Sequence, residues 1–309
     1  MSQTDHRPSD RPGPRLSLGP ISYYWPKDKV DAFYAQAATL PVDIVYLGET
    51  ICGKRNELRL EDWLAIGERL AEAGKEVVLS TLSLLEAESE MMRLRAICDN
   101  GRFLVEANDM GAVQLLQGRP FVVGHSVNVY NDRSLQVLAR GGLKRWVLPV
   151  ELTADTLAEM QRLRPDGIET EVYAYGRLPL AYSARCFTAR ARNLPKDDCQ
   201  YCCIDYPDGL VVSTQDEQGF LALNGVQTQS AATNNLLPEL DRLRELEVDI
   251  LRINPQAEGT GEIVRLFDQA LRGECSPAEA SKKVNALTPS GACDGYWHGA
   301  AGMDQVANA

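Results

Sequence analysis

Residues 42–79 contain one complete strand–helix–strand unit: Val42-Asp-Ile-Val-Tyr-Leu47, then Asp62-Trp-Leu-Ala-Ile-Gly-Glu-Arg-Leu-Ala-Glu-Ala73 with Gly74, then Glu76-Val-Val-Leu79. The middle segment has apolar residues at three- and four-residue spacing and stops at a glycine, which is typical of an amphipathic helix. The two flanking segments are short apolar runs, which we expect to be strands. A strand, a helix and a second strand in this order predict neighbouring parallel strands.

The same alternation continues along the chain. Further strands are expected at 16–18, 103–106, 121–123, 146–150 and 169–175, with helical patterns between them. About seven such units before residue 180 exceed the number that a compact doubly wound domain usually needs. The sequence therefore predicts an α/β protein with a TIM-like (β/α) barrel, closed by a strand at 249–253 and a helix at 263–271.

The remaining residues suggest one domain with two additions. Residues 1–15 are polar and rich in proline, and we expect a disordered N-terminal extension. Residues 16–309 are expected to form a single barrel domain, interrupted late in the chain by a Cys-rich insertion at about 177–235. That insertion includes an expected hairpin of 210–213 with 220–223.

The insertion carries a run of cysteines in a segment too polar for a core. Cys186, Cys199 and Cys203 are separated by twelve and then three residues, and Cys52 lies in a polar loop after an expected strand. Four thiolates hold either structural zinc or an iron–sulfur cluster; a zinc ribbon would usually have two short Cys pairs, so the spacing favours the cluster. Cys202 and Cys203 are both candidates for the last ligand. Cys98, at helical spacing from an apolar residue, is expected in the core.

Composition excludes several classes of function. The net charge of −11, without a basic stripe, argues against nucleic-acid binding. No apolar run approaches the roughly eighteen residues that a transmembrane helix needs. Eight cysteines without an apolar leader indicate reduced thiols, so we expect a cytoplasmic protein. Three histidines, with no Gly-x-Ser-x-Gly or His-Glu-x-x-His motif, give classical protease chemistry little support.

Polar residues follow the expected strands, at the end of a barrel where catalytic groups gather. The catalytic candidates are Glu49, Asp109 and Arg177, and His125 lies at a similar position. Each has an ordinary alternative: Asp109, for example, could simply cap the helix that follows it.

Several motifs resemble a known family. Tyr-Leu-Gly-Glu-Thr (46–50), Val-Glu-Ala-Asn-Asp (105–109), Tyr-Gly-Arg-Leu-Pro-Leu (175–180) and the cysteine run are similar to the collagenase-like peptidase family, over about Leu16 to Met303. Within it, the chain most resembles the UbiV-type subunits of anaerobic ubiquinone biosynthesis. The resemblance implies a 4Fe-4S cluster bound by Cys52, Cys186, Cys199 and Cys203, and it selects Cys203 over Cys202.

The resemblance also implies an activity and partners. The activity is an O2-independent hydroxylation of the aromatic head group of a ubiquinone precursor, carried out together with a homologous UbiU-type subunit. Prephenate is the expected oxygen donor, and a lipid-carrier protein could present the prenylated precursor. Three alternatives remain open: an RNA-base hydroxylase of the same family, a peptidase, and a noncatalytic electron-transfer or scaffold subunit that carries a structural cluster.

Overall fold

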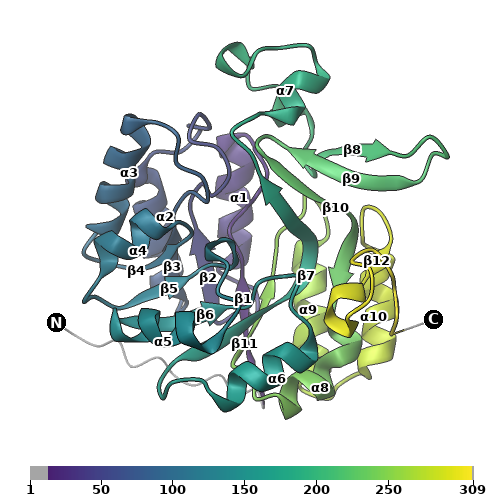
Figure 1. Ribbon diagram of the computed structural model, residues 1–309. Coiled ribbons are helices and arrows are strands. Elements are labelled where there is room, and N and C mark those ends of the chain that lie inside the picture. Colours follow the sequence, from purple (N-terminus) through teal and green to yellow (C-terminus); the bar gives the residue numbers. More distant parts are fainter. Residues whose placement is uncertain (1–12, 308–309) are drawn as a thin grey trace.

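The computed structural model describes residues 13–307 and contains a closed barrel of eight parallel strands (Figure 1). Seven strands neighbour one another in chain order, and the eighth closes the barrel by pairing in parallel with both the first and the seventh. The barrel strands are β1 (Arg15–Leu18), β2 (Ile44–Leu47), β3 (Glu76–Ser80), β4 (Leu104–Ala107), β5 (Phe121–Val123), β6 (Leu143–Val147), β7 (Glu169–Tyr182) and β11 (Ile250–Ile253). The predicted TIM-like barrel is confirmed.

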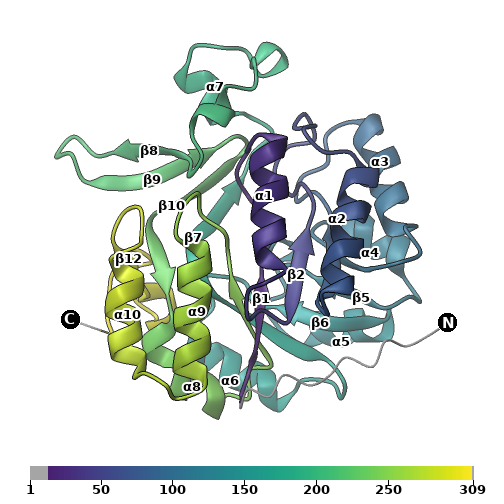
Figure 2. The same cartoon turned by 180° about the vertical axis from the view of Figure 1, so that it is seen from behind.

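Helices surround this barrel on the outside, as both views show (Figures 1 and 2). They are α1 (Lys27–Ala37), α2 (Leu60–Glu72), α3 (Glu88–Cys98), α4 (Met110–Leu116), α5 (Asp132–Arg140), α6 (Ala154–Arg162), α8 (Leu240–Glu245), α9 (Thr260–Leu271) and α10 (Pro277–Asn285). In α2, Ile66 and Leu70 lie one turn apart and are buried, as the helical spacing predicts. Among residues 13–307, no helix combines the length and the apolarity needed to cross a bilayer.

Alternating strand residues build two separate cores. One set, including Val45, Leu47 and Leu79, faces the helices and joins the main hydrophobic cluster. The alternate set, including Ile44 and Tyr46, faces the barrel interior, where a second and smaller cluster lies. The two faces differ because successive side chains of a strand point to opposite sides.

Strand β7 continues past the barrel and starts an antiparallel extension. Its outer half pairs with β10 (Gln227–Asn235), which pairs in turn with β9 (Gly219–Asn224), and β9 pairs with β8 (Leu210–Ser213). Between β7 and β8 lie α7 (Phe187–Ala191) and two 3-10 turns, η2 (Lys196–Asp198) and η3 (Cys202–Asp205), in a segment that projects from the barrel (Figure 1). A two-residue strand, β12 (Ala292–Cys293), also pairs with β10.

Several expected boundaries differ from the structure, among them those of β6, β7 and β1. Strand β6 covers 143–147 instead of 146–150, because Arg145 is an interior residue of this strand and Pro149 lies beyond its end. Strand β7 extends to Tyr182 because β10 supplies hydrogen-bonding partners beyond residue 175. Strand β1 already includes Arg15, and residues 1–12 of the expected extension lie outside the described residues.

Candidate functional site

The cysteines singled out by their spacing come from two distant parts of the chain. Cys52 lies in the loop after β2, Cys186 directly precedes α7, Cys199 follows η2, and Cys203 lies within η3. The Cys186 thiol interacts electrostatically with those of Cys52, Cys202 and Cys203, and Cys199 interacts with Cys202. The fold therefore brings the loop after β2 next to the projecting segment.

Side-chain contacts fasten these two segments together. The Lys54 ammonium donates to the backbone oxygen of Lys196 at 2.8 Å and to the Asp197 carboxylate at 3.1 Å. Lys196 in turn pairs with Glu86, in the loop before α3. Each contact joins residues more than a hundred positions apart, so the two segments are held by polar bonds in addition to the chain connection.

Arg55 is the buried cation of this site. Its side chain donates to the Ser22 backbone oxygen at 2.8 Å and to the Asn224 side chain at 2.7 Å, and it also hydrogen-bonds the Cys203 thiol. Burial raises the pKa of Cys203 to about 11, against the opposing effect of Arg55. Arg55 was not singled out from the sequence, although a basic residue three positions after the candidate ligand Cys52 was a usable signal.

The number and type of these donors match those of a metal–sulfur group. Cys52, Cys186, Cys199 and Cys203 are four free, partly exposed thiols, the number that binds a 4Fe-4S cluster. The cations of Lys54 and Arg55 lie near enough to Cys52 to interact with a thiolate there. Among the described residues, no three His, Cys, Asp or Glu side chains are grouped so as to hold a single metal ion.

A second, polar site lies at the C-terminal mouth of the barrel. It is a small cavity of about 10 Å³, room for about one water molecule. Its lining comes from several barrel strands and from the extension, and includes Glu106, Asn108, His125, Tyr173, Tyr182, Gln227, Gln229 and Asn254. Tyr182 and the two glutamines were not singled out from the sequence, because they reach the mouth only through the unforeseen pairing of β7 with β10.

Besides Glu106 Oε1, which is ion-paired with Arg252, three buried polar atoms at this mouth have no hydrogen-bond partner among residues 13–307: His125 Nδ1, Gln229 Oε1 and Asn254 Oδ1. Burial, reinforced by the positive charge of Arg252, lowers the pKa of His125 to about 3, so its imidazole is neutral at physiological pH. The other ring nitrogen lies 3.2 Å from the Tyr182 hydroxyl. Since unpaired buried polar groups are costly, these atoms are suited to bind a polar ligand or an ordered water.

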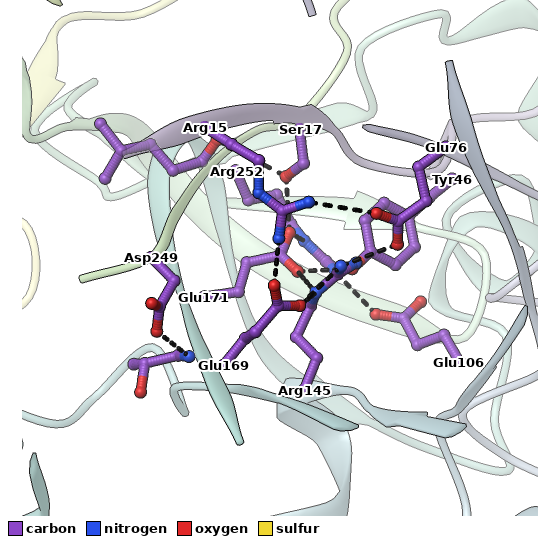
Figure 3. Close-up of polar contacts among 12 residues, drawn as sticks. Arg15, Ser17, Tyr46, Glu76, Glu106, Arg145, Glu169, Glu171, Asp249 and Arg252 are labelled. Atoms are coloured by element: carbon purple, nitrogen blue, oxygen red, sulfur yellow. Dashed lines mark hydrogen bonds and ion pairs between the residues drawn. The ribbon is translucent and has the colours of Figure 1, made fainter. Parts of the chain in front are cut away.

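Buried charges lie below this mouth, inside the barrel (Figure 3). Arg252 lies 2.8 Å from a carboxylate oxygen of Glu106 and 2.8 Å from one of Glu171. Arg145 pairs with Glu76 and Glu169 and also donates to the Tyr46 hydroxyl. Burial alone would raise the pKa of Glu171, but Arg252 and Arg145 outweigh it and hold that pKa below its ordinary value. This network fixes the orientation of Glu106, which lines the mouth.

The three catalytic candidates occupy different places. Glu49 lies at the thiol site, where its carboxylate accepts from the backbone N–H groups of Ile51 and Cys52 at 2.8 and 3.1 Å. Burial raises the pKa of Glu49, and Arg55, 3.6 Å away, opposes this effect. The Glu49 carboxylate thus shapes the loop that carries Cys52.

Asp109 and Arg177 are not among the residues that line the mouth cavity, although the Arg177 backbone oxygen accepts from the hydroxyl of Tyr173, which does. Asp109 caps α4, because its carboxylate accepts from the Gly111 N–H at 2.6 Å. Its contacts are therefore those of a helix cap, the alternative to a catalytic role. Arg177 lies inside β7 and not after it; it is buried and donates to the Ser230 backbone oxygen at 3.2 Å. Cys98 is buried in the main core, as predicted.

Comparison with known proteins places these sites in a family context. Residues 28–306 match the family model described as peptidase family U32. A Helicobacter pylori protein named tRNA hydroxylation protein P is 26% identical over 199 residues, which cover 57% of this chain and 45% of that protein. The protein of the same name from Haemophilus influenzae is 28% identical over 124 residues, covering 39% of this chain and 23% of that protein. The chain thus spans less than half the length of either relative. The solved structure of the U32 peptidase Mk0906 matches 83% of this chain and 99% of its own, at 12% identity and a TM-score of 0.43.

Proposed function

The chain belongs to peptidase family U32, and from this premise we propose that it is the iron–sulfur subunit of an O2-independent hydroxylase that acts on ubiquinone precursors. The name shared by the two relatives supports hydroxylation as the reaction class. The ubiquinone precursor is the proposed substrate because of the sequence motifs around Glu49, Arg177 and Cys186, together with the net charge of −11.

One observation carries the proposal: a continuous series of side-chain hydrogen bonds joins the thiol site to the barrel mouth. Arg55, bonded to the Cys203 thiol, donates to Asn224, whose amide nitrogen donates to Gln227 at 3.2 Å. Gln227 donates to the Tyr182 hydroxyl at 2.9 Å, and that hydroxyl lies next to His125. These hydrogen bonds give the proposed cluster site a direct polar connection to the unpaired groups at the mouth.

The proposed reaction replaces an aromatic C–H bond by C–OH. If the donor is a hydroxylated organic acid such as prephenate, its C–OH bond breaks and a C–H bond forms in its place, so the arene loses two electrons and the donor gains them. A 4Fe-4S cluster held by the four thiols would supply one-electron transfer. The neutral His125 imidazole and the Gln229 amide oxygen would bind one small polar group, of about the size of a water molecule, at the mouth.

The proposal includes partners. A homologous UbiU-type subunit is expected to form a heterodimer with this chain, and interfaces of that kind bury roughly 1,200–2,000 Å². A lipid-carrier protein could present the prenylated precursor to the pair in the cytoplasm.

The decisive experiment is a deletion of the gene in its host. Without oxygen, the deletion strain should accumulate an under-hydroxylated prenylphenol and lose ubiquinone, whereas aerobic cultures should make ubiquinone normally. Quinone extracts of cultures complemented with wild type or with Cys186→Ala give the comparison. Unchanged anaerobic ubiquinone in the deletion strain would refute the proposal.

Iron and sulfide analysis of anaerobically purified protein tests the ligand set. Cys52→Ala, Cys186→Ala, Cys199→Ala and Cys203→Ala should each sharply reduce bound iron, while Cys98→Ala should not. Equal iron in all five variants would remove the cluster from the proposal.

A second candidate is an RNA-base hydroxylase, favoured by the name of the two relatives. The acidic net charge disfavours it, since RNA backbones are bound through clustered Lys and Arg. In the deletion strain, loss of a modified RNA base with unchanged ubiquinone would select this alternative. A peptidase activity, which the family description suggests, gains little support from the barrel mouth, because the His125 ring is hydrogen-bonded to the Tyr182 hydroxyl and not to a serine, threonine or cysteine among the described residues.

A further inference from the structure

A large apolar cavity, distinct from the barrel mouth, lies between helices α2 and α3. Its volume is about 450 Å³, which is within the range of small-molecule sites, about 300–1,000 Å³. Its floor comes from β2 and β3, through Leu47 and Leu79. Its walls include Trp63 of α2, Leu85 before α3, and Leu94 and Ile97 of α3.

The cavity exists because two neighbouring helices pack away from each other. Helix α2 packs on α1, and α3 packs on α4. The cavity opens to solvent between the two helices, so a ligand could enter it. Its mostly apolar lining and its volume are those of a site for an apolar small molecule.

One end of this cavity touches the thiol site. Glu49, Gly53 and Arg55 line it, and Gly53 directly follows Cys52. The Arg93 side chain donates to the Gly53 backbone oxygen at 2.7 Å and so ties α3 to the cysteine loop. A smaller cavity of about 30 Å³ shares Glu49 and Arg55 with it. The apolar end and the polar end of one long molecule could therefore be bound in a single orientation.

We infer that this cavity binds the isoprenoid tail of a prenylated phenol, with the phenol end at Glu49 and Arg55. The inference rests on the proposed function, which supplies an amphipathic substrate with one apolar tail and one polar ring. Leu and Ile side chains and the face of the Trp63 ring offer such a tail favourable burial. The partly exposed Glu49 carboxylate, held by Arg55, supplies an acceptor where the hydroxyl would lie. A volume near the lower end of ligand sites accommodates the part of the tail next to the ring.

Calorimetric titration of the full chain, purified anaerobically, tests this assignment. The probes are 2-farnesylphenol, phenol and myristate. Farnesylphenol should bind at least about tenfold more tightly than phenol, because the tail supplies most of the apolar area that is buried. Ile97→Trp, which fills the cavity, should weaken farnesylphenol binding at least about tenfold. Leu85→Trp fills the same space from another element and serves as the second variant. Val137→Trp, at a position 64% exposed on α5, is the matched control and should bind as wild type does.

Three results would overturn the inference. They are unchanged affinity in both filled variants with wild-type thermal unfolding, equal affinity for phenol and farnesylphenol, and tighter binding of myristate, which would assign the cavity to an acyl chain. The titration needs neither turnover nor the partner subunit, so its failure differs from failure of the proposed function. Farnesylphenol binding that Ile97→Trp abolishes, in a protein whose deletion leaves ubiquinone unchanged, would refute only the proposed function.

Discussion

At the scale of single residues, the barrel interior depends on buried charges that must all be paired. Arg252 and Glu171 are about 1% exposed or less, and Arg252 also lies over the Tyr46 ring at 4.0 Å. Arg252→Met should lower the free energy of unfolding by about 3–5 kcal/mol, because it leaves buried carboxylates without a counter-charge. Arg242→Met, which removes an exposed pair with Glu245, should cost less than about 1 kcal/mol. Urea unfolding measures both, and equal losses would contradict this account.

His125 makes the free energy of unfolding depend on pH, and its lowered pKa fixes the direction of that dependence. Its pKa is about 3 in the folded protein, against about 6.5 in an unfolded chain. Below pH 6.5 the unfolded state therefore binds a proton that the folded state does not, so stability contributed by His125 is present above pH 6.5 and declines toward pH 3. The slope from this one group is at most about 1.4 kcal/mol per pH unit. Urea unfolding of wild type and His125→Asn between pH 7 and 4.5 should show a shallower slope for the variant, and parallel slopes would exclude this role.

Residue identity alone predicted some of these features and missed others. The buried position of Cys98 followed from helical spacing, and the capping contact of Asp109 followed from its place before a helix. Arg145 and Arg252 could not be recognised as interior residues, because a charge is expected outside unless its partner is known. Their partners lie on other strands, and only the closed barrel brings them together.

At the scale of elements, alternation of apolar runs predicted the barrel strands because each is buried on both faces. The predictions were weakest where a strand carries an interior charge, as β6 does at Arg145, or where pairing continues outside the barrel, as in β7. The hairpin of β8 and β9 was predicted within one residue at every boundary. The mouth could be placed from the sequence, but the residues that the extension contributes to it could not.

Gly48 determines how β2 ends and the cysteine loop begins. Its φ is +129°, and an added Cβ would lie 2.6 Å from the Ser80 backbone oxygen of β3. Gly48→Ala should therefore lower the free energy of unfolding by about 3 kcal/mol, from backbone strain together with a contact that backbone cannot easily relieve. Gly74→Ala is the matched control, with a φ of +82° and no atom within 4 Å of its Cβ. It should cost about 1–2 kcal/mol from strain alone. Equal losses of unfolding free energy in the two variants would show that the β3 backbone moves away from the added Cβ without a measurable penalty.

At the scale of the whole molecule, the proposed cluster would join the barrel to the segment that projects from it. That segment, 183–209, has little core of its own, and Arg190 and Arg192 are exposed on it. Ligands from both Cys52 and the projecting segment would close a long loop, and binding to the closed form lowers the population of open forms. Removing iron by anaerobic chelation should therefore raise the rate of tryptic cleavage at Arg190 and Arg192, by about tenfold.

Two variants show whether cluster binding, and not a general loss of stability, protects the projecting segment from trypsin. Cys98→Ala should keep the protection of the iron-loaded wild type. Cys52→Ala lacks one proposed ligand and should be cleaved as fast as the chelated protein. Because Cys52 lies on the barrel, outside the segment that is cut, this substitution does not alter the cleavage sites themselves. If chelation leaves the cleavage rate unchanged, the contacts of Lys54 with Lys196 and Asp197 suffice to hold the segment, and the cluster has no structural share in joining it to the barrel.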